Sequence, residues 1–497
     1  MCKHVVIIGS GLGGLSCGVV LAKNGYRVTV LEQGTQVGGC LQCFTRQGVK
    51  YETGMHFIGS ASKGQTLHRL MHFLEITDKV QLSPLDPLGY DVIDIDGRRY
   101  PFAMGREAFI DQLSQHFPNQ RHQLERYFDL VKQVSGASSL HSLRSASKDI
   151  FNTEYQLRSV NEVVESIIDD PLLARVLVGN LPLYAGERDK TPFATHAFIM
   201  DFYNESAYRI VGGSDTVAHA LVSVLERYGG RVFTRKRVTR IECDERRATS
   251  VLTTDGERIE ADIIISDAHP MRTMEMLESP LIRPAFRRRI KNIPQTVGGF
   301  SVYLHFRNQS MPYMNHNYYG YECGTPWGCE HYDAESWPKG FLYMHFCHEQ
   351  DPIWAQGGVI LSYMQMDDVA RWRGTRPGRR GADYEAMKHE HAERLIDVVE
   401  RHVPGLRASL AGYHTSTPLT YYDYTGSEGG SMYGVAKDIH LGVACRVPHR
   451  TRVPNVLQTG QNINSHGMLG VLVGTMVTCG ELIGSGRLYE QLNKDSE

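Results

Sequence analysis

The chain opens with a short apolar run that leads directly into glycines. Residues 4–9 read HVVIIG, and an uninterrupted apolar run of this length is typical of a strand buried on both faces of a parallel sheet. A segment with small and apolar residues at helical spacing follows, and it ends at Asn24-Gly25. Residues 26–31, YRVTVL, then give a second apolar strand. This order of strand, turn, helix and strand predicts an α/β fold.

Two stretches in the next part of the chain have the spacing of helices. Apolar residues recur at helical intervals in residues 106–133 and again in residues 160–178, with few turn signals. Just before them, Asp96-Gly97 separates two strand-like runs and predicts a tight hairpin. We therefore expect a helical insertion after the hairpin, and we expect this insertion to act as a lid.

Later segments alternate between helix and strand patterns. They predict helices over residues 214–229 and 383–402, strands over residues 231–241 and 248–265 around the turn Asp255-Gly256, and a sheet within the aromatic-rich residues 296–372. The sequence therefore combines a helix-linked part with a second part that is rich in strands.

The composition is that of an ordinary globular protein. The 497 residues are 41% hydrophobic and 22% charged, which gives room for two or three domains and excludes disordered and fibrous classes. The net charge of -2 gives no general attraction to nucleic acid, so we expect no nucleic-acid partner. We interpret the basic runs at residues 287–291 and 371–380 as solvated surface, and leave open a contact with an anionic membrane or a charged substrate.

The spacing of the cysteines and the length of the apolar runs indicate the compartment in which we expect the protein. Ten cysteines lack the spacing of a disulfide scaffold, which favours a reducing compartment. No charged and apolar leader precedes the first strand, so we expect no signal peptide. The longest nearly uncharged run, residues 467–480, is shorter than the ~20 residues that cross a bilayer. We expect a cytoplasmic protein and leave peripheral attachment to a membrane open.

The glycines after the first strand form a dinucleotide fingerprint. The turn matches G-x-G-x-x-G over Gly9, Ser10, Gly11, Leu12, Gly13 and Gly14. Gly9 permits the tight turn, Gly11 lets the backbone approach a pyrophosphate, and Gly14 lets the helix pack closely against the strand. Glu32 ends the second strand, where a carboxylate accepts hydrogen bonds from an adenosine ribose. These residues predict a dinucleotide site at the helix N-terminus.

A second glycine-rich stretch helps to decide between FAD and NAD. Gly38-Gly39 follow closely after Glu32, and residues 51–59, YETGMHFIG, contain another glycine turn. A simple NAD domain would continue into another helix and strand at this point. The glycine-rich detour favours a longer cofactor, so the predicted cofactor is FAD.

The carboxyl-terminal segment repeats the logic of the first turn. It contains a short strand at residues 456–458, a glycine turn at Gly460 and a helix that begins near Gly467. The amides at such a helix N-terminus stabilise negative charge on a ligand. We predict that this turn forms the second half of the same cofactor site.

Several segments together resemble one protein family. They are LEQGTQVGGC at residues 31–40, YETGMHFIG at 51–59, YAGERDKTPF at 184–193, YRIVGGSDTVAHAL at 208–221, SMYGVAKDIH at 431–440 and TGQNINSHGMLG at 459–470. These segments are similar to the branch of the FAD-dependent amine-oxidase-like superfamily that contains phytoene desaturases, carotenoid isomerases and retinol saturases. Among these, the retinol saturases (all-trans-retinol 13,14-reductases) are the most similar. The resemblance covers most of the chain and fades between about residues 305 and 400.

The resemblance implies a Rossmann-like FAD-binding domain with an interleaved α+β substrate domain. On that basis we expect the FAD-binding domain in residues 1–82, 205–295 and 441–497, the substrate sheet in residues 83–103 and 296–440, and the helical insertion or lid in residues 104–204.

The resemblance also implies contacts with the cofactor. A valine placed like Val238 lends its backbone to the adenine, and residues placed like Gly460 and Gln461 approach the ribityl-phosphate chain. Residues placed like Met468 and Leu469 lie beside the isoalloxazine ring. The remaining residues expected to bind the cofactor are Ser10, Gly13, Gln33, Gly39, Cys40, Met55 and His56.

The implied activity is a redox change, or a redox-assisted isomerisation, at a carbon–carbon double bond. The implied substrate is an apolar polyene or isoprenoid, and an electron donor or acceptor that the sequence does not name must take part. Saturation would need a hydride from reduced flavin and a general acid for the neighbouring carbon. The candidate catalytic acids are His56, Tyr433 and His466, with His466 expected to lie nearest to the flavin.

Two other functions stay open. A flavin amine oxidase would share the cofactor domain and would build an aromatic cage from tyrosines such as those of TPLTYYDY at residues 417–424. A non-catalytic carrier of prenyl lipids with the same fold would lack the flavin chemistry. Visible flavin colour in the purified protein separates the carrier from both enzymes.

Other cysteines and histidines carry weaker signals. Cys40 and Cys43 form a C-x-x-C, which we interpret as a loop with two thiols that shield or tune the flavin, and not as a thioredoxin-like pair. His389 and His391 are two positions apart and do not share a helix face. We predict no metal site.

Overall fold

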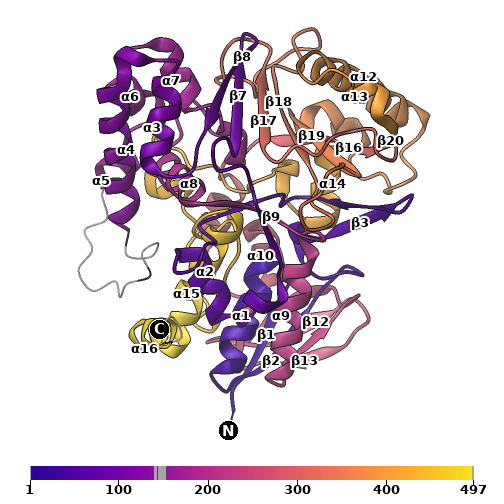
Figure 1. Cartoon of the computed structure of the whole chain (residues 1–497). Helices are drawn as coiled ribbons and strands as arrows, with labels where there is room; N and C mark the ends of the chain where they lie inside the picture. The colour runs from indigo at the N-terminus through magenta and orange to yellow at the C-terminus, as the bar shows by residue number, and fades with distance from the viewer. Residues whose placement is uncertain (1, 139–142, 144–152, 495–497) are drawn as a thin grey trace.

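The lower part of the molecule in Figure 1 is built on a parallel sheet. The computed structural model describes residues 2–138, 143 and 153–494. The sheet has five strands in the order β10-β2-β1-β14-β21, each paired in parallel with its neighbours. The strands are β1 (His4–Ile8), β2 (Arg27–Leu31), β10 (Arg231–Phe233), β14 (Ile263–Ser266) and β21 (Val456–Gln458). Three distant segments of the chain therefore share one sheet, and the predicted α/β class is confirmed.

Helices pack around this sheet. α1 (Leu12–Lys23) lies against α9 (Asp215–Arg227) and α15 (Gly467–Ile483), and their apolar side chains join one core. The other helices of this part are α2 (Thr66–Phe73), α10 (Pro270–Met276), α11 (Pro284–Lys291) and α16 (Ser485–Lys494). The close contact between α1 and α15 brings the first and last glycine turns of the chain to the same edge of the sheet.

The strand predicted over residues 231–241 is wrong as a single element. Its first part, β10, joins the parallel sheet, and its second part, β11 (Val238–Cys243), begins a separate four-stranded sheet with β12 (Ala248–Thr253), β13 (Arg258–Glu260) and β15 (Leu277–Glu278). The break has a local cause. The amides of Arg235 and Lys236 donate to the carbonyls of Gly34 and Glu32, which turns the chain between the two sheets.

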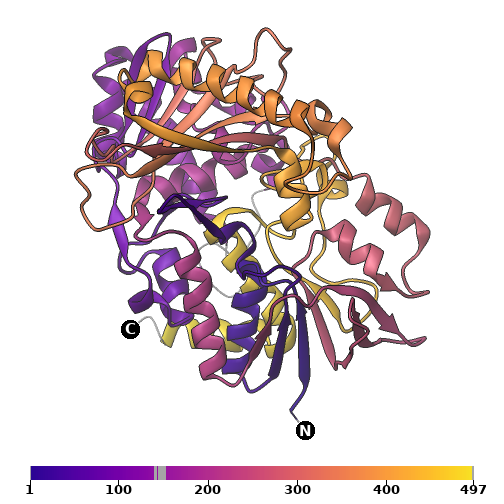
Figure 2. The ribbon, with the colours of Figure 1, turned by 90° about the vertical axis from the view of Figure 1, so that its right-hand side faces the viewer.

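The upper part of the molecule contains a seven-stranded sheet with helices above it (Figure 2). Its order is β20-β16-β19-β18-β17-β7-β8. The strands are β7 (Asp91–Ile95), β8 (Arg98–Phe102), β16 (Gly298–Phe306), β17 (Asn317–Tyr321), β18 (Gly340–His345), β19 (Gly357–Met364) and β20 (Leu410–Ser416). β7 and β8 form the hairpin predicted at Asp96-Gly97, and they complete a sheet whose other strands come from the second half of the chain.

The two faces of this sheet have different partners. Phe300, Phe341 and Ile360 pack beneath α12 (Ala382–His402), with α13 (Leu406–Ser409) and α14 (Pro418–Thr425) nearby. The alternate residues point to the opposite face and join the core of the helical insertion; they are Tyr303, Tyr319, Leu342, Met344, Leu361 and Tyr363. The strand period of two therefore separates a structural face from a face that borders a cavity.

The helical insertion lies at the upper left in Figure 1. Its helices are α3 (Arg106–Ser114), α4 (Arg121–Gly136), α5 (Thr153–Leu157), α6 (Val160–Glu165), α7 (Pro171–Leu177) and α8 (Phe193–Glu205). Both predicted helical runs are broken, because Pro118 and Pro171 stand at the start of new helical turns and disfavour helix in the residue before them. Residues 139–142 and 144–152 of the predicted lid lie outside the described residues. The lid role and the predicted domain boundaries stay predictions.

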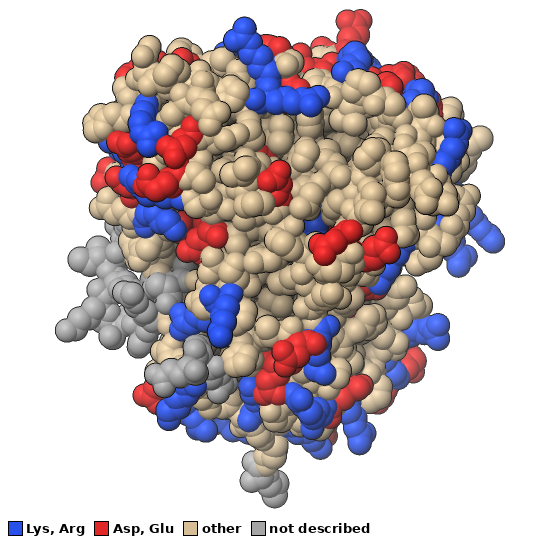
Figure 3. Space-filling view, viewed as in Figure 1, with Lys and Arg blue, Asp and Glu red and all other residues tan. Residues whose placement is uncertain are grey.

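Small strands join the two halves of the molecule. β3 (Cys43–Arg46) and β4 (Val49–Glu52) form a hairpin, and β9 (Ala207–Ile210) lies between β5 (Ile58–Gly59) and β6 (Leu82–Pro84). On the face in Figure 3, acidic and basic side chains are interspersed, and no broad region of one sign is visible. Within the part of the chain that the structure describes, no helix has the length and apolar character to cross a membrane.

Candidate functional site

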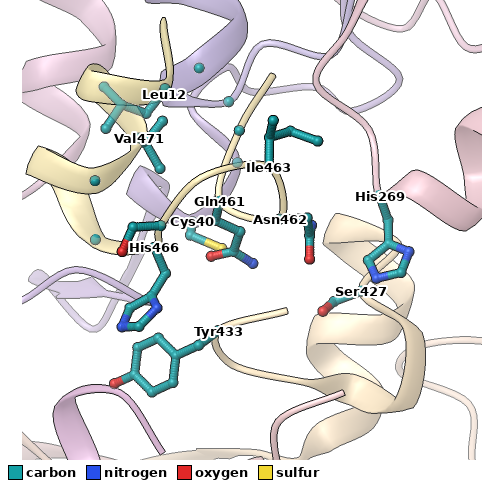
Figure 4. Close-up of a pocket in the computed structure, with 18 of the residues that line it drawn as sticks. Leu12, Cys40, His269, Ser427, Tyr433, Gln461, Asn462, Ile463, His466 and Val471 are labelled. Carbon is teal, nitrogen blue, oxygen red and sulfur yellow. The ribbon is translucent and has the colours of Figure 1, made fainter. Parts of the chain in front are cut away.

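A large cavity lies where the parallel sheet, the seven-stranded sheet and the insertion meet. Its volume is ≈ 1810 Å³. Both glycine turns line it, together with α8 of the insertion and strands β18 and β19 of the upper sheet. Figure 4 shows side chains from both ends of the chain around this space, among them Leu12, Cys40, Gln461 and His466. We therefore compare the predicted cofactor-binding residues with the residues that line this cavity.

The amino-terminal turn is fixed by a buried carboxylate. Glu32 accepts from the Ser10 amide at 3.0 Å and from the Ser10 hydroxyl at 2.6 Å, while its other oxygen accepts from the Gly34 amide at 2.7 Å. The amide of Gly38 donates to the Ser10 carbonyl at 2.9 Å. Glu32 thus holds the turn that follows β1 and also lines the cavity, where a ribose hydroxyl would find it.

The two glycine turns are in direct contact. A Cβ added at Gly13 would lie 2.8 Å from the backbone nitrogen of Gly460, and one at Gly39 would lie 3.2 Å from the Cα of Gly11. Gly460 has a φ of +94°, a left-handed conformation that glycine adopts readily. No larger residue fits at Gly13 without displacing backbone. The predicted convergence of the two ends of the chain on one place is therefore present in the structure.

Both helices that start at these turns leave their N-termini free for a ligand. α1 and α15 have no side-chain cap, and their first residues line the same cavity. Such termini present unpaired amides and the positive end of the helix dipole. The side-chain nitrogen of Asn464 is buried, lines the cavity and has no hydrogen-bond partner among the described residues. Amides, a free donor and glycine surfaces fit the diphosphate and ring of FAD.

The structure places nearly all of the predicted cofactor-binding residues on the cavity wall. These residues are Gly9, Ser10, Gly11, Gly13, Glu32, Gln33, Gly39, Cys40, Met55, His56, Val238, Gly460, Gln461, Met468 and Leu469. Gly14 does not line the cavity. A Cβ there would lie 2.3 Å from the Gly9 carbonyl oxygen, so Gly14 serves the close packing of helix on strand. Contact of each residue with FAD stays a prediction.

Asp267 is a site residue that the sequence analysis missed. It follows β14, and its carboxyl oxygens would lie 2.5 Å from a Cβ at Gly11 and 2.5 Å from a Cβ at Gly460. Burial, with a further contribution from the charge of Glu32, raises the pKa of Asp267 to about 7, although the amides of Gly14 and Gly11 donate to it. Its position at the carboxyl end of a strand in the same parallel sheet was the signal that could have identified it.

His466 and Tyr433 form a pair at one side of the cavity (Figure 4). Their ring centroids are 4.7 Å apart. The Tyr433 hydroxyl donates to the Pro182 carbonyl at 2.7 Å, and burial raises the pKa of Tyr433 far above its ordinary value. Burial and the nearby charge of Lys437 lower the pKa of His466 to about 4, while the ring hydrogen-bonds the Leu183 backbone. Both side chains are therefore neutral at pH 7.

His56 lies apart from that pair. Its Nδ1 is 3.3 Å from the Glu52 carboxylate, and both side chains are almost fully buried. The ring also lies 6.0 Å from the ring of Phe346. Of the three candidate acids, His56 is the one with a carboxylate in contact, so its protonated form has an ion-pair partner.

Lys437 is a second residue that the sequence analysis did not select, although it lies in the SMYGVAKDIH segment. Its side chain lines the cavity, and its ammonium has no hydrogen-bond or ion-pair partner among the described residues. Burial lowers its pKa. Its positive charge, when the group is protonated, acts on the nearby His466 and lowers the pKa of that ring.

The wall between α8 and the seven-stranded sheet is apolar. Its main side chains are Phe198, Ile199 and Phe202 of α8 with Leu342, Met344 and Leu361 of β18 and β19. Among the described residues, these three elements contribute no carboxylate to the cavity. Tyr203 and Tyr421 add aromatic surface, and the Tyr421 hydroxyl donates a hydrogen bond to the Thr53 carbonyl at 2.9 Å. This end of the cavity can hold a long apolar molecule.

The Cys40-Cys43 pair does not act as a close dithiol. Cys40 lines the cavity, whereas the Cys43 thiol contacts the Ser214 hydroxyl at 3.5 Å. Burial raises the pKa of Cys40 to about 11 and that of Cys43 to about 12. Both groups are therefore protonated and unreactive at neutral pH.

The metal prediction considered the pair His389 and His391, and the structure adds one further group of ligand side chains. The ring of His389 contacts the Tyr413 hydroxyl at 2.6 Å, and the ring of His391 contacts the Met387 carbonyl at 2.9 Å. Among the described residues, Glu187, Glu330 and His331 form one group with ligand atoms within 4.8 Å of one another. The Lys190 ammonium already pairs with Glu187, and we assign no metal ion to this group.

Comparisons with known proteins agree with this geometry. A family model described as flavin containing amine oxidoreductase matches residues 12–371. The chain is 29% identical to all-trans-retinol 13,14-reductase of Homo sapiens, over 99% of this chain and 87% of that protein. It is 23% identical to phytoene desaturase (lycopene-forming) of a Paracoccus species, over 87% of each.

Solved structures agree on the fold. Wild-type putrescine oxidase bound to putrescine superposes with a TM-score of 0.63 over 97% of this chain and 99% of that chain. The two sequences are 15% identical, so the likeness concerns the fold alone.

Proposed function

This chain belongs to the family of flavin containing amine oxidoreductases, and we propose that it acts on a carbon–carbon double bond of an apolar polyene or isoprenoid. It is an FAD-dependent oxidoreductase. The proposal covers saturation, desaturation and redox-assisted isomerisation of such a bond. All three reactions need the same arrangement, an apolar substrate held beside the flavin. The observation that carries it is the apolar wall formed by α8, β18 and β19, which offers no carboxylate to a charged amine.

Substrate position would be set by shape and water exclusion. Leu342, Met344 and Leu361 form one continuous surface across two paired strands, and Phe198 and Phe202 face the same cavity from α8. A conjugated chain between these walls loses contact with water, which favours binding by burial of apolar area. When bound, FAD supplies the hydride chemistry.

Proton supply is assigned by elimination among the three candidates. The Tyr433 proton is held by the Pro182 carbonyl, and His466, with its pKa near 4, carries no extra proton at pH 7. The His56 ring lines the cavity, and its Nδ1 lies 3.3 Å from the Glu52 carboxylate. Under this proposal His56 is the general acid, and His466 with Tyr433 shapes the site. A positioned acid of this kind contributes about 10²–10⁴-fold to the rate.

An anaerobic flavin assay tests the function. The FAD-loaded protein is reduced with dithionite, mixed with retinoids, carotenoids and other polyenes, and followed by flavin absorbance. If the reaction is a saturation, at least one polyene should reoxidise the flavin and leave a product with one double bond fewer. If it is a desaturation, a polyene should instead reduce the oxidised flavin. Using dithionite makes the result independent of the physiological electron donor.

The matched arm of this assay uses amines with the oxidised flavin. Reduction by a primary amine, together with no response to any polyene, would contradict the proposal and support an amine oxidase. A His56→Gln variant should keep FAD and slow the polyene reaction. A His466→Gln variant should keep most of the rate, and the opposite order would reject His56 as the acid.

We also propose that a membrane surface delivers the apolar substrate. Val443 is 78% exposed, and the loop that carries it lines the cavity beside α11. Arg289 of α11 donates to the carbonyls of Ala444 and Arg446 in that loop. Exposed apolar residues beside cations fit an anionic lipid surface. Co-sedimentation with anionic vesicles should fall for Val443→Asp, and equal binding of both proteins would contradict this route.

A further inference from the structure

Two cysteines outside the cavity share one acceptor. Cys323 and Cys329 lie in the loop between β17 and β18. The Cys323 thiol donates to the Thr325 carbonyl oxygen at 3.2 Å, and the Cys329 thiol approaches the same oxygen at 3.7 Å. The two thiols also interact with each other, which lowers the pKa of Cys323 and raises that of Cys329. The loop therefore holds two sulfur atoms side by side, although both are free thiols in this structure.

The two thiols differ in exposure and in ionisation. Cys323 is exposed, and the hydrogen bond from Cys329, aided by the Thr325 amide and the charge of Lys339, lowers its pKa to about 6. Cys329 is 5% exposed, and the bond to Cys323 together with burial raises its pKa well above the ordinary value. Glu330 adds to that rise and Lys339 opposes it. An accessible thiolate beside a shielded thiol is the arrangement of an attacking and a resolving cysteine.

The surrounding contacts hold this loop against the rest of the protein. Arg175 of α7 donates to the Gly324 carbonyl at 2.8 Å. Trp327, between the two cysteines, packs on the core that contains Cys329 and the inner face of the seven-stranded sheet. Neither cysteine lines the cavity. The pair is thus anchored and is separate from the flavin site.

We propose that Cys323 and Cys329 are a thiol–disulfide exchange site for a small disulfide such as glutathione disulfide. The Cys323 thiolate attacks one sulfur of the small disulfide, forms a mixed disulfide and releases one glutathione thiolate. Cys329 then gives its proton to solvent, attacks the Cys323 sulfur and releases the second glutathione. Starting from the Cys323 thiolate and the Cys329 thiol, the protein pair loses two electrons and one proton, and glutathione disulfide gains the two electrons and leaves as two glutathione thiolates.

Peptide mapping of the full-length, FAD-loaded protein tests the exchange. The protein is incubated with glutathione disulfide, free thiols are blocked with N-ethylmaleimide, and the digest is analysed by mass spectrometry. Trypsin releases residues 308–339 as one peptide with both cysteines, because no Lys or Arg lies between Arg307 and Lys339. This peptide should become two hydrogen atoms lighter and should no longer react with the maleimide.

Single variants separate the two roles. Cys329→Ser should accumulate glutathione on Cys323, and Cys323→Ser should leave Cys329 unmodified. At pH 6.5, iodoacetamide should alkylate Cys323 roughly fivefold faster than the exposed Cys2, because its larger thiolate fraction outweighs its lower intrinsic nucleophilicity. A Cys40→Ser and Cys43→Ser double variant is the matched control and should oxidise at 308–339 as the unaltered protein does.

Three results would overturn the proposal. One is a 308–339 peptide that stays fully reactive with maleimide while Cys2 is glutathionylated. Another is a Cys329→Ser protein that carries no adduct on Cys323. The third is equal alkylation of Cys323 and Cys2 at pH 6.5. None of these measurements depends on the substrate of the flavin, so they stand apart from the outcome of the flavin assay.

Discussion

The two ends of the cavity are built in different ways. The nucleotide end consists of two glycine turns and two helix N-termini, and its contacts are mostly backbone. The substrate end consists of apolar side chains from α8, β18 and β19. Backbone recognition depends on how closely chains can approach, whereas side-chain recognition depends on volume and shape. Substitutions at the nucleotide end should therefore reduce flavin content, whereas substitutions at the substrate end should slow the reaction with the polyene.

The largest effect is expected at the nucleotide end. Gly13→Val places a branched side chain where even a Cβ meets the Gly460 nitrogen at 2.8 Å, so the two turns must separate. We expect purified protein without visible flavin absorbance and without recovery on addition of FAD. Gly486→Ala in α16 is the control, because a Cβ there meets nothing within 4 Å. Normal flavin content in Gly13→Val would show that the turns do not hold the cofactor together.

At the substrate end, Leu361→Trp should leave flavin content unchanged. The larger ring fills the apolar wall, so reoxidation of reduced flavin by the polyene should slow on the order of 100-fold. Ile360→Val changes the neighbouring residue on the opposite face of β19, beneath α12. It should cost about 0.5–1.5 kcal/mol of stability and leave reoxidation unchanged. Equal rates of flavin reoxidation for Leu361→Trp and the unaltered protein would show that this wall does not contact the substrate.

Asp267 makes the nucleotide end sensitive to pH. Its folded pKa of about 7 lies above that of the unfolded chain, so the folded state holds a proton that the unfolded state has lost. The stability from this proton is complete below about pH 4 and is lost as pH rises through the folded value. Ionised Asp267 should also repel the diphosphate. Asp267→Asn should bind FAD about tenfold, or ~1.4 kcal/mol, more tightly at pH 8.

The same variant should match the unaltered protein at pH 5, where both carry a neutral side chain. Titration of the apoprotein with FAD, followed by quenching of flavin fluorescence, measures both affinities. A constant ratio of affinities at the two pH values would mean that Asp267 does not ionise in this range.

The smallest effect concerns the boundary between the two ends. The charge of Lys437 contributes to the low pKa of His466, so Lys437→Met should move that pKa upward. The ring proton shifts of His466 followed by NMR against pH report the change. Lys190→Met is the control, since Lys190 pairs with Glu187 and does not act on His466. If the pKa of His466 is unchanged in Lys437→Met, the charge of Lys437 does not act on the His466 ring.

The nucleotide end could be predicted from sequence because its signals are local. Gly9, Gly11 and Glu32 have fixed spacing within one βαβ unit, and Gly460 follows a short apolar strand. The structure brings these residues together as that spacing implies. Asp267 was missed because a single Asp after a strand has no such pattern.

The substrate end could not be predicted in the same way. Leu342 and Leu361 are paired across β18 and β19, and Tyr319 pairs with Leu342, so the wall depends on sheet register between distant segments. A shift of one residue would turn each side chain to the other face. Sequence spacing also failed to identify the interacting cysteines. The C-x-x-C at Cys40 holds unreactive thiols, whereas Cys323 and Cys329 approach each other only because the loop between them folds.

The contact between Gly13 and Gly460 also orders events during synthesis. One edge of β14 stays open until β21 is made, and the first glycine turn, which packs against Asp267 before that, lacks its contact with Gly460 until that residue leaves the ribosome. At roughly 5–20 residues per second, the chain between Gly13 and Gly460 takes roughly 20–90 s to be made. Cofactor capture therefore waits until both glycine turns have been made. Until then, the nascent chain presents an open sheet edge that chaperones must protect.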